Sequence, residues 1–404
     1  MFSSPTLNTL TTTELAEFVE RALRDLATRR DRSALPALAR VAQSAGTAIG
    51  SAAAATPPAG PRPTGVVTAS RPEPIERPGR VETFYGIRET QPGPRWRALF
   101  DATWAGYRAW YLSEGDRARP RLPAARRMLD RHMPELAPTW ERLVELVDGD
   151  ETAARMLTLY DPPRFLPGCS QAVLTGAEPV LVRNYDYRPD LCERVVYSSA
   201  FTGRRVLGSS DCLWGLLDGM NDAGLVISLT FGGRPGGGSG FGIPIVVRYL
   251  LEVAETVADV TARLAHLPVN MAYNLTVLDR NADVATVFLA PGAKPEVSRH
   301  RVATNHRGTV PDWPEHARTF RSVERQQAIL DVLSGRPDPE QLIAQFLRKP
   351  LYNTAYAEGF GTMYTAAYRP KLGVVDYVWP GSTWRRGFDS PSQTHTATLG
   401  VDAP

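Results

Sequence analysis

Cys169 stands where two sequence patterns meet, and it is the residue of this chain best placed to act as a nucleophile. Residues 164–176 read RFLPGCSQAVLTG, and a strand-like alternation begins directly after Gly168. A thiolate is a strong nucleophile, although a single cysteine is more often a small buried apolar residue. Arg183 and Asp186 follow in LVRNYDYRPD, at the end of a predicted hairpin that can fold both charges back toward Cys169. A thiol, a cation and a carboxylate at this spacing indicate nucleophilic catalysis, whereas the two charged residues alone would indicate a surface ion pair.

Three further polar motifs follow in the same half of the chain. They are DGMNDAGLVIS at residues 218–228, ATNHRG around Asn305 and SVERQQ around Arg325. Asn221 and Gly224 fit a tight hairpin turn better than a catalytic role. Asn305 taken alone is as readily a turn residue. His306 keeps open a cysteine–histidine pair with Cys169, as in a cysteine peptidase, although a single histidine is more often structural.

Taken in order, these motifs resemble a known group of enzymes. Cys169, RNYDY, GMNDAGL, TNH and Ser-x-x-Arg are similar to the N-terminal nucleophile hydrolases related to choloylglycine hydrolase, penicillin V acylase and especially acyl-coenzyme A:6-aminopenicillanate acyltransferase. The resemblance covers roughly residues 85–390. Residues 134–163 resemble the helical propeptide of the acyltransferase branch, and residues 361–381 resemble its closing hairpin. The resemblance implies an α+β fold, a four-layer αββα sandwich.

The same resemblance implies that the chain is made as a precursor and that Cys169 cuts the bond that precedes it. The thiol would attack the carbonyl of Gly168 to give a thioester that water hydrolyses, and glycine would permit the strained approach of the backbone. The new α-amino group has an ordinary pKa of about 7.7 to 8.0 and the thiol one of about 8.5, so the amine can accept the thiol proton near neutral pH. One residue would then supply both nucleophile and base.

The remaining catalytic roles also come from the resemblance. Asp186 would orient the α-amino group of Cys169 by a hydrogen bond, and the positive charge of Arg183 would stabilise the thiolate. Asn305 matches the oxyanion-hole position, where one amide N–H contact is typically worth about 3 kcal/mol. Arg325 matches the arginine that completes the polar network.

Three residues are predicted to contact the substrate. After GMNDAGLVIS some relatives continue with Leu-Asn-Phe, whereas this chain has Leu229, Thr230 and Phe231. Threonine thus stands where those relatives have asparagine, which changes one contact on the oxyanion side. Asn274 in AYNLTV is predicted as a second polar contact. GGRPGGGSGFG, residues 232–242, lacks the Gly-Lys-Ser/Thr ending of a phosphate loop, and we expect a mobile loop over the substrate cleft.

The elements that position these residues fall into three segments. Residues 1–80 predict a helix at 12–30 and then a disordered linker rich in Ala and Pro. Residues 81–168 predict a helical, propeptide-like region that forms the α fragment. Its apolar helical face is marked by aromatic residues at spacings of three and four: Trp96, Phe100, Trp104, Tyr107 and Tyr111. Residues 169–404 predict the catalytic β fragment, with strands of period two and helices between them, one of which covers residues 316–333.

Composition narrows the class of protein. The 404 residues are 43% hydrophobic, enough for a sizeable core, and the 46 basic and 43 acidic residues form no long runs, so we expect neither nucleic acid nor a membrane as partner. Three cysteines form no disulfide framework, and the N-terminus carries no signal-like segment, which favours a cytoplasmic protein. Six histidines and three cysteines without ligand spacing predict no metal, and no cofactor is expected.

The sequence therefore predicts an autoproteolytically activated cysteine amidohydrolase or acyltransferase that acts on a linear, non-peptide amide through a thioester. Its substrate would be a small-molecule acyl amide or acyl-coenzyme A. Its two fragments could remain together as a heterodimer, alone or in a homo-oligomer of such pairs. Two alternatives stay open: an unprocessed protein of the same shape that binds a ligand without chemistry, and a cysteine peptidase that uses Cys169 and His306.

Overall fold

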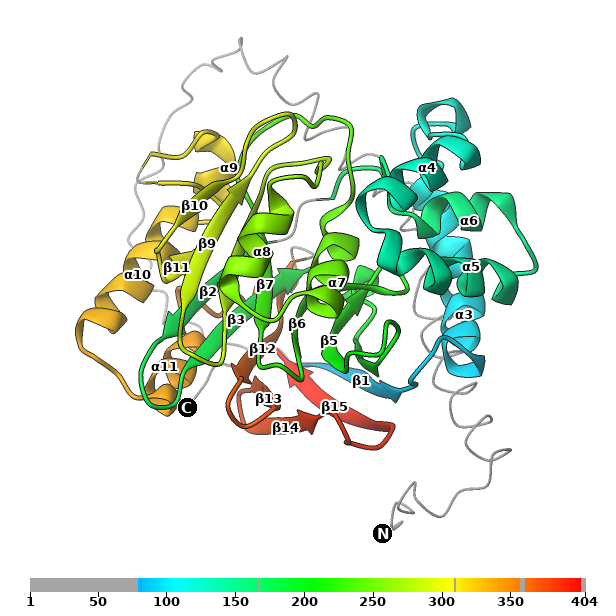
Figure 1. The fold of residues 1–404 in the computed structure, drawn as a ribbon. Helices are drawn as coiled ribbons and strands as arrows, with labels where there is room; N and C mark the ends of the chain where they lie inside the picture. The colour runs from blue at the N-terminus through cyan, green and yellow to red at the C-terminus, as the bar shows by residue number, and fades with distance from the viewer. Residues whose placement is uncertain (1–78, 166–167, 309, 357–359, 401–404) are drawn as a thin grey trace, which may run out of the picture.

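The computed structural model describes residues 79–165, 168–308, 310–356 and 360–400 (Figure 1). The predicted helix at 12–30 and nearly all of the predicted linker lie outside these residues. Within them the chain forms two β-sheets, four α-helices before residue 168, and five α-helices after it.

The larger sheet has nine strands. Their spatial order is β10 (Glu296–Ser298), β9 (Val284–Leu289), β8 (Tyr273–Leu278), β7 (Val226–Phe231), β6 (Gly215–Asn221), β5 (Val206–Asp211), β4 (Val195–Ser199), β1 (Arg80–Arg88) and β15 (Gln393–Leu399). From β10 to β4 each strand pairs antiparallel with the next one along the chain, which short turns permit. The β6–β7 turn contains Asn221, whose Oδ1 atom accepts hydrogen bonds from the backbone of Ala223 and Leu225, as expected for a turn residue.

The smaller sheet has six strands and carries Cys169. Their order is β11 (Val302–Ala303), β2 (Gly168–Leu174), β3 (Val180–Tyr187), β12 (Gly361–Arg369), β13 (Val374–Trp379) and β14 (Ser382–Gly387). The β2–β3 hairpin aligns Gly168 with Asp186 and Gln171 with Arg183. The hairpin predicted after Cys169 is confirmed, and it brings both charged residues back to the start of β2.

The two sheets face each other, with helices on both outer faces. Helices α7 (Ile243–Val253) and α8 (Val257–Leu264) pack on the nine-stranded sheet, while α10 (Ser322–Ser334) and α11 (Pro339–Phe346) pack on the six-stranded sheet (Figure 1). Strands such as β3 and β6 are buried along almost their whole length because both faces of each sheet are covered. The predicted four-layer αββα sandwich is confirmed.

Four helices precede the six-stranded sheet in the sequence and gather at one side of the molecule (Figure 1). They are α3 (Pro94–Tyr111), α4 (Leu122–His132), α5 (Ala137–Leu146) and α6 (Glu151–Leu157). The predicted aromatic face of α3 is confirmed, since four of its five aromatic residues are buried and Trp104 is partly buried. Asp150 caps the start of helix α6, because its carboxylate accepts a hydrogen bond from the backbone N–H of Ala153.

Strand β1 was not predicted. The region 81–168 is therefore not helical throughout: it opens with a strand that pairs antiparallel with β15 and parallel with β4. Its partner β15 lies more than 300 residues later, and such long-range pairing leaves no local signal in the sequence.

The helix predicted over residues 316–333 is interrupted. Helix α9 (Pro314–Thr319) ends before Phe320, and α10 begins after Arg321, which has a left-handed backbone with φ of 51°. The periodicity of the apolar residues does not reveal such a break, because a single residue with positive φ redirects the chain. The break sets the direction of α10, which carries Arg325.

Candidate active site

Every polar group of Cys169 is engaged by a side chain of the site. Its backbone N–H donates to Oδ1 of Asn305 at 3.0 Å, and its carbonyl oxygen accepts from Nη1 of Arg325. Nη2 of Arg183 donates to its Sγ atom at 3.3 Å. Cys169 is fully buried as the second residue of β2, with the scissile bond predicted by the sequence directly before it. An apolar core cysteine has no need of such partners, so this is a built polar site.

The alternation of β2 and β3 separates the site into two halves. Arg183 and Gln171 face the other sheet, where Arg183 pairs with Asp218 on β6 and Gln171 bonds to Thr276 on β8. Ser170 faces the helices instead, and its hydroxyl accepts a hydrogen bond from Arg325 of α10 at 2.6 Å.

Asp218 is a site residue that sequence reasoning missed. Its carboxylate forms an ion pair with Arg183, and both side chains are completely buried. It also accepts hydrogen bonds from the hydroxyls of Tyr364, at 2.7 Å, Tyr368, and Ser209, at 2.9 Å. The one signal was an acidic residue within the apolar strand sequence GLLDGMN, because a buried carboxylate requires partners.

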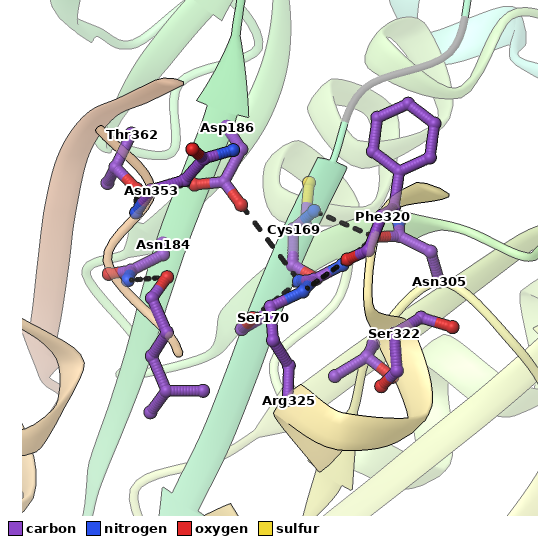
Figure 2. A network of polar contacts seen from close by, with 12 residues as sticks. Cys169, Ser170, Asn184, Asp186, Asn305, Phe320, Ser322, Arg325, Asn353 and Thr362 are labelled. Atoms are coloured by element: carbon purple, nitrogen blue, oxygen red, sulfur yellow. Dashed lines mark hydrogen bonds and ion pairs between the residues drawn. The ribbon is translucent and has the colours of Figure 1, made fainter. Parts of the chain in front are cut away.

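Asp186 lies directly across from Gly168 in the β2–β3 register. Its Oδ1 accepts from the Thr362 hydroxyl at 2.6 Å, and its Oδ2 lies 4.0 Å from Nη1 of Arg325 (Figure 2). Burial raises the pKa of Asp186, and Arg325 and Thr362 offset this only in part. In the intact chain the Cys169 nitrogen has a single hydrogen, which it donates to Asn305. A hydrogen bond from this nitrogen to Asp186 therefore requires the free α-amine that cleavage would produce, because only the amine has further hydrogens to donate.

Asn305 and Arg325 are joined on the helix side of the strand (Figure 2). Nη2 of Arg325 donates to Oδ1 of Asn305 at 2.7 Å, and its Nε donates to the carbonyl of Phe320 at 2.9 Å. The amide Nδ2 of Asn305 donates to the carbonyl of Phe231 at 3.3 Å. In the intact chain Asn305 therefore holds the Cys169 nitrogen through its oxygen, and the oxyanion role of its N–H stays a prediction.

Thr230 and Asn274, predicted to contact the substrate, support the segment that carries Asn305. The Thr230 hydroxyl and Nδ2 of Asn274 each donate to the carbonyl of Thr304 at 2.9 Å, and Asn274 also reaches the carbonyl of His306. Asn274 further lines a small pocket together with three basic residues: Arg234, Lys294 and Arg307. Direct contact of Thr230, Phe231 and Asn274 with a substrate stays a prediction.

His306 is engaged away from the thiol. Its Nε2 lies 3.0 Å from Oε1 of Gln326, and its Nδ1 lies 3.0 Å from the Ser322 hydroxyl and 3.1 Å from that of Thr304. Burial lowers the pKa of His306. Both ring nitrogens thus serve to anchor the start of α10, which gives no support to a Cys169–His306 pair.

The predicted acidity of the mature thiol and α-amine stays a prediction, whereas the reason given for glycine at position 168 needs correction. In the intact chain burial raises the pKa of the Cys169 thiol, although Arg183 and Arg325 oppose this shift. Gly168 lies in β2 and is not among the glycines with positive φ. A Cβ atom there would lie 2.9 Å from the ring of Phe360 and 3.2 Å from Cβ of Asp186, so close packing is the reason for glycine.

The glycine-rich segment 232–242, expected to be a mobile loop, is anchored at several points. The backbone N–H of Gly240 and the hydroxyl of Ser239 donate to the two carboxylate oxygens of Asp161 at 2.7 and 2.9 Å. Gly238 donates its N–H to the carbonyl of Asn270. The loop therefore joins the helical region before Cys169 to the sheet after it.

Within the described ranges, no group of histidine, cysteine or acidic side chains is arranged to hold a metal ion. None of the helices described has the length and apolar character that crossing a membrane would require.

The two-sheet sandwich, with a polar cluster around a cysteine at the start of an inner strand, defines the class of protein as the N-terminal nucleophile hydrolases. The family is more particular: a sequence model of the acyl-coenzyme A:6-aminopenicillanic acid acyl-transferase family matches residues 173–384, and the chain belongs to this family. The chain is accordingly a hydrolase of carbon–nitrogen bonds other than peptide bonds or an N-acyltransferase. The family match begins four residues after Cys169.

Solved structures with a similar fold include three amide hydrolases. An N-acylethanolamine-hydrolyzing acid amidase ortholog from Caenorhabditis elegans is 15% identical, with coverage of 50% of this chain and 93% of its own and a TM-score of 0.38. Penicillin V acylase from Agrobacterium tumefaciens is 14% identical, with coverage of 58% and 94% and a TM-score of 0.39. A mutant conjugated bile acid hydrolase from Clostridium perfringens is 12% identical, with coverage of 57% and 97% and a TM-score of 0.38. The comparison with curated proteins gave no match.

Proposed function

We propose that this chain is the precursor of a cysteine amidohydrolase or acyltransferase, which cuts its own Gly168–Cys169 bond and then acts on a small-molecule acyl compound. The observation that carries the proposal is the set of partners around Cys169. Its N–H, carbonyl oxygen and Sγ atom each have a different buried polar side chain as partner. This set lies at the first residues of an inner strand, where a new chain terminus would be formed.

Autoprocessing would proceed by acyl transfer from nitrogen to sulfur. The Cys169 thiol loses its proton, its sulfur bonds to the carbonyl carbon of Gly168, and the carbon–nitrogen bond breaks as the nitrogen takes up a proton. Water then hydrolyses the thioester and leaves a carboxylate at Gly168 and a free thiol and α-amine at Cys169. Arg183, in contact with Sγ, stabilises the thiolate that attacks.

In the mature enzyme the same thiol would attack the carbonyl of an acyl substrate. The α-amine of Cys169 acts as base, held by Oδ1 of Asn305 and by Asp186 across the strand pair. The N–H of Asn305 stabilises the oxyanion, and Arg325 fixes Asn305. The acyl group passes to Cys169 as a thioester, from which water gives hydrolysis and an amine gives acyl transfer.

The two fragments would remain together as a heterodimer. Strand β1 precedes the cleaved bond but lies between β4 and β15, which follow it. Two indole N–H groups also cross between the fragments: Trp96 donates to the carbonyl of Leu213 at 3.2 Å, and Trp214 donates to that of Leu157 at 2.9 Å. The three cysteines are unpaired, which fits a reducing compartment such as the cytoplasm.

The test is the mass and N-terminal sequence of the purified protein. We expect a fragment that begins at Cys169, co-purifying with the fragment that precedes it, and a single intact chain for Cys169→Ala. Matured protein is then screened with acyl amides and acyl-coenzyme A thioesters. Only full-length chain after long incubation, with no turnover, would contradict the proposal and favour an unprocessed binding protein, which the complete burial of Cys169 also permits.

A further inference from the structure

A pocket with basic side chains opens at one end of the nine-stranded sheet, where β7 and β9 end and β8 begins. Its volume is about 340 Å³, open mouth included. Its lining combines apolar residues of β9 with three basic residues, Arg234, Lys294 and Arg307, and we name it the basic pocket. A pocket of this size can hold a small ligand, which a few polar groups orient.

The charges around the basic pocket are not balanced. Arg234 donates to the carboxylate of Asp312 at 2.7 Å, and Arg307 donates to that of Glu296 at 2.6 Å. Lys294 is exposed, and its ammonium group has no hydrogen bond or ion pair within the described part of the chain. One positive charge therefore remains for a ligand. Because lysine and arginine side chains bind carboxylate and phosphate groups, the basic pocket favours an anion.

The basic pocket is next to the segment that carries Asn305. Nδ2 of Asn305 donates to the carbonyl oxygen of Phe231 at 3.3 Å, and the next residue, Gly232, lines the pocket. The carbonyl carbon of Phe231 is bonded to the nitrogen of Gly232, so this nitrogen lies within about 6 Å of Nδ2 of Asn305. Asn274 also lines the pocket, and its Nδ2 donates to the carbonyl of Thr304, directly before Asn305. A ligand the size of a small amino acid spans such a distance.

The proposed chemistry places the leaving group of a substrate on the side of Asn305. When the carbon–nitrogen bond of an amide breaks, its nitrogen takes up the proton that the α-amine of Cys169 has received from the thiol. The Cys169 nitrogen is bonded to Oδ1 of Asn305, so the leaving nitrogen must approach this position. Gly168, on the acyl side of the predicted scissile bond, is instead aligned with Asp186. The basic pocket therefore lies on the leaving-group side.

We infer that the basic pocket binds an oxyanion on the leaving group of the substrate, with Lys294 as a specificity-determining residue. This inference rests on the proposed function. The substrate class is an acyl amide or thioester whose leaving part carries a carboxylate or a phosphate group. Both groups present charged oxygen atoms to the ammonium group of Lys294, and they differ in charge and size, so a matched series of substrates tells them apart.

The test compares amides that share one acyl group and differ in the leaving amine, which is ethanolamine, glycine or O-phosphoethanolamine. The acyl group is the one best accepted in the screen of acyl amides, or hexanoyl if none is turned over. For matured wild type we expect kcat/KM of at least one anionic compound to exceed that of the ethanolamide by about tenfold, as for one charged hydrogen bond. The two anionic compounds distinguish a carboxylate site from a phosphate site. Lys294→Glu reverses the charge, and we expect it to reduce the preference to about twofold or less.

Lys371→Glu is the matched control, because it makes the same change in net charge at an exposed lysine that donates to the carbonyl of Ala177 and does not line the pocket. Its preference should equal that of wild type.

Three results overturn the inference: a wild type without the preference, a Lys294→Glu variant that keeps it, and a Lys371→Glu variant that loses it equally. The proposed function is read separately, from the fragment mass and from turnover of any acyl compound. If no turnover is seen, calorimetric binding of the same amides decides. Binding that requires the anionic group and that Lys294→Glu weakens about tenfold supports the pocket, and its absence overturns the inference.

Discussion

The two arginines beside Cys169 approach it from opposite faces of the six-stranded sheet, and they are held in different ways. Arg183 comes from the face between the sheets, touches Sγ, and forms a fully buried ion pair with Asp218. Burial lowers its pKa, but the interactions with Cys169 and Asp218 outweigh burial, and the net shift of the Arg183 pKa is upward. The charge of Arg183 is therefore matched by a carboxylate at short range.

Arg325 comes from the helix face and is bound mainly by neutral oxygens. Its partners are the carbonyls of Cys169 and Phe320, the hydroxyl of Ser170 and the amide of Asn305. The carboxylate of Asp186 is 4.0 Å away, and burial lowers the pKa of Arg325 despite it. Its hydrogen bonds are satisfied, but its charge is only partly matched.

This difference gives the two arginines different roles. Arg183 contacts the thiol and is also needed to neutralise the buried carboxylate of Asp218, whereas the charge of Arg325, matched only in part, remains available to negative charge that forms elsewhere in the site during the reaction. We therefore expect variants on the Arg183 side to act first on stability, and variants on the Arg325 side to act first on rate.

Asp218→Asn should have the largest effect, because it leaves Arg183 as an unpaired buried cation. We expect the free energy of unfolding to fall by about 3 to 5 kcal/mol. Urea unfolding of the intact chain measures this, with Cys169→Ala in both proteins so that cleavage does not interfere. The control is Asp101→Asn, whose ion pair with Arg97 is exposed and whose loss should cost less than about 1 kcal/mol. An equal fall in the free energy of unfolding for the two variants would contradict the larger stabilising role assigned to the Arg183–Asp218 pair.

Asn305→Ala tests the Arg325 side, where rate should suffer more than stability. It removes the predicted oxyanion donor and one acceptor of Arg325, so we expect kcat of matured protein to fall about a hundredfold with little change in KM. Asn221→Ala is the control, since that side chain bonds the carbonyls of Leu251 and Ala254 and serves the β6–β7 turn. Asn221→Ala should lower stability without lowering kcat per matured molecule. A normal kcat for Asn305→Ala together with a reduced kcat for Asn221→Ala would contradict the assignment of Asn305.

Asp186→Asn removes the carboxylate nearest to Arg325, and we expect maturation and turnover to slow about tenfold, as for loss of one charged hydrogen bond.

The same substitution should raise the free energy of unfolding at neutral pH. Because burial raises the pKa of Asp186, its protonated form stabilises the fold below the unfolded pKa of about 3.9, and this contribution is lost as pH rises through the folded pKa. Asn does not ionise, so the variant should be the more stable protein at neutral pH but not in acid. Urea unfolding from about pH 3 to 7 checks the sign, and a constant difference would refute it.

Local patterns in the sequence predicted the fold wherever partners are close in the chain. The β2–β3 hairpin and the aromatic face of α3 follow from alternation and from helical spacing. Strand β1 was missed because its neighbours β4 and β15 are supplied by distant segments. The break at Arg321 was missed because one left-handed residue does not alter the apolar periodicity.

The same limit applies to the candidate site. Cys169, Arg183, Asp186, Asn305 and Arg325 were predicted as a set from five ordered motifs, and the structure brings them together. Asp218 was missed, since its importance lies in what surrounds it, which is four donors around one buried carboxylate. Such surroundings come from elements distant in the chain, and no spacing within one motif encodes them.

His306→Ala should have the smallest effect, and it also acts on the Arg325 side. His306 anchors α10 through Ser322 and Gln326, so its loss should shift Arg325 slightly and reduce turnover by less than about threefold. Because the proposed base is the α-amine of Cys169, which must be unprotonated to act, activity should rise with pH around about 7.7 to 8.0 in wild type and variant alike. In a cysteine peptidase that pairs Cys169 with His306, the imidazole would be the base and the variant would be inactive. The pH profiles of kcat/KM for the two matured proteins therefore separate the mechanisms: a common profile supports the α-amine, and a dead variant supports the histidine.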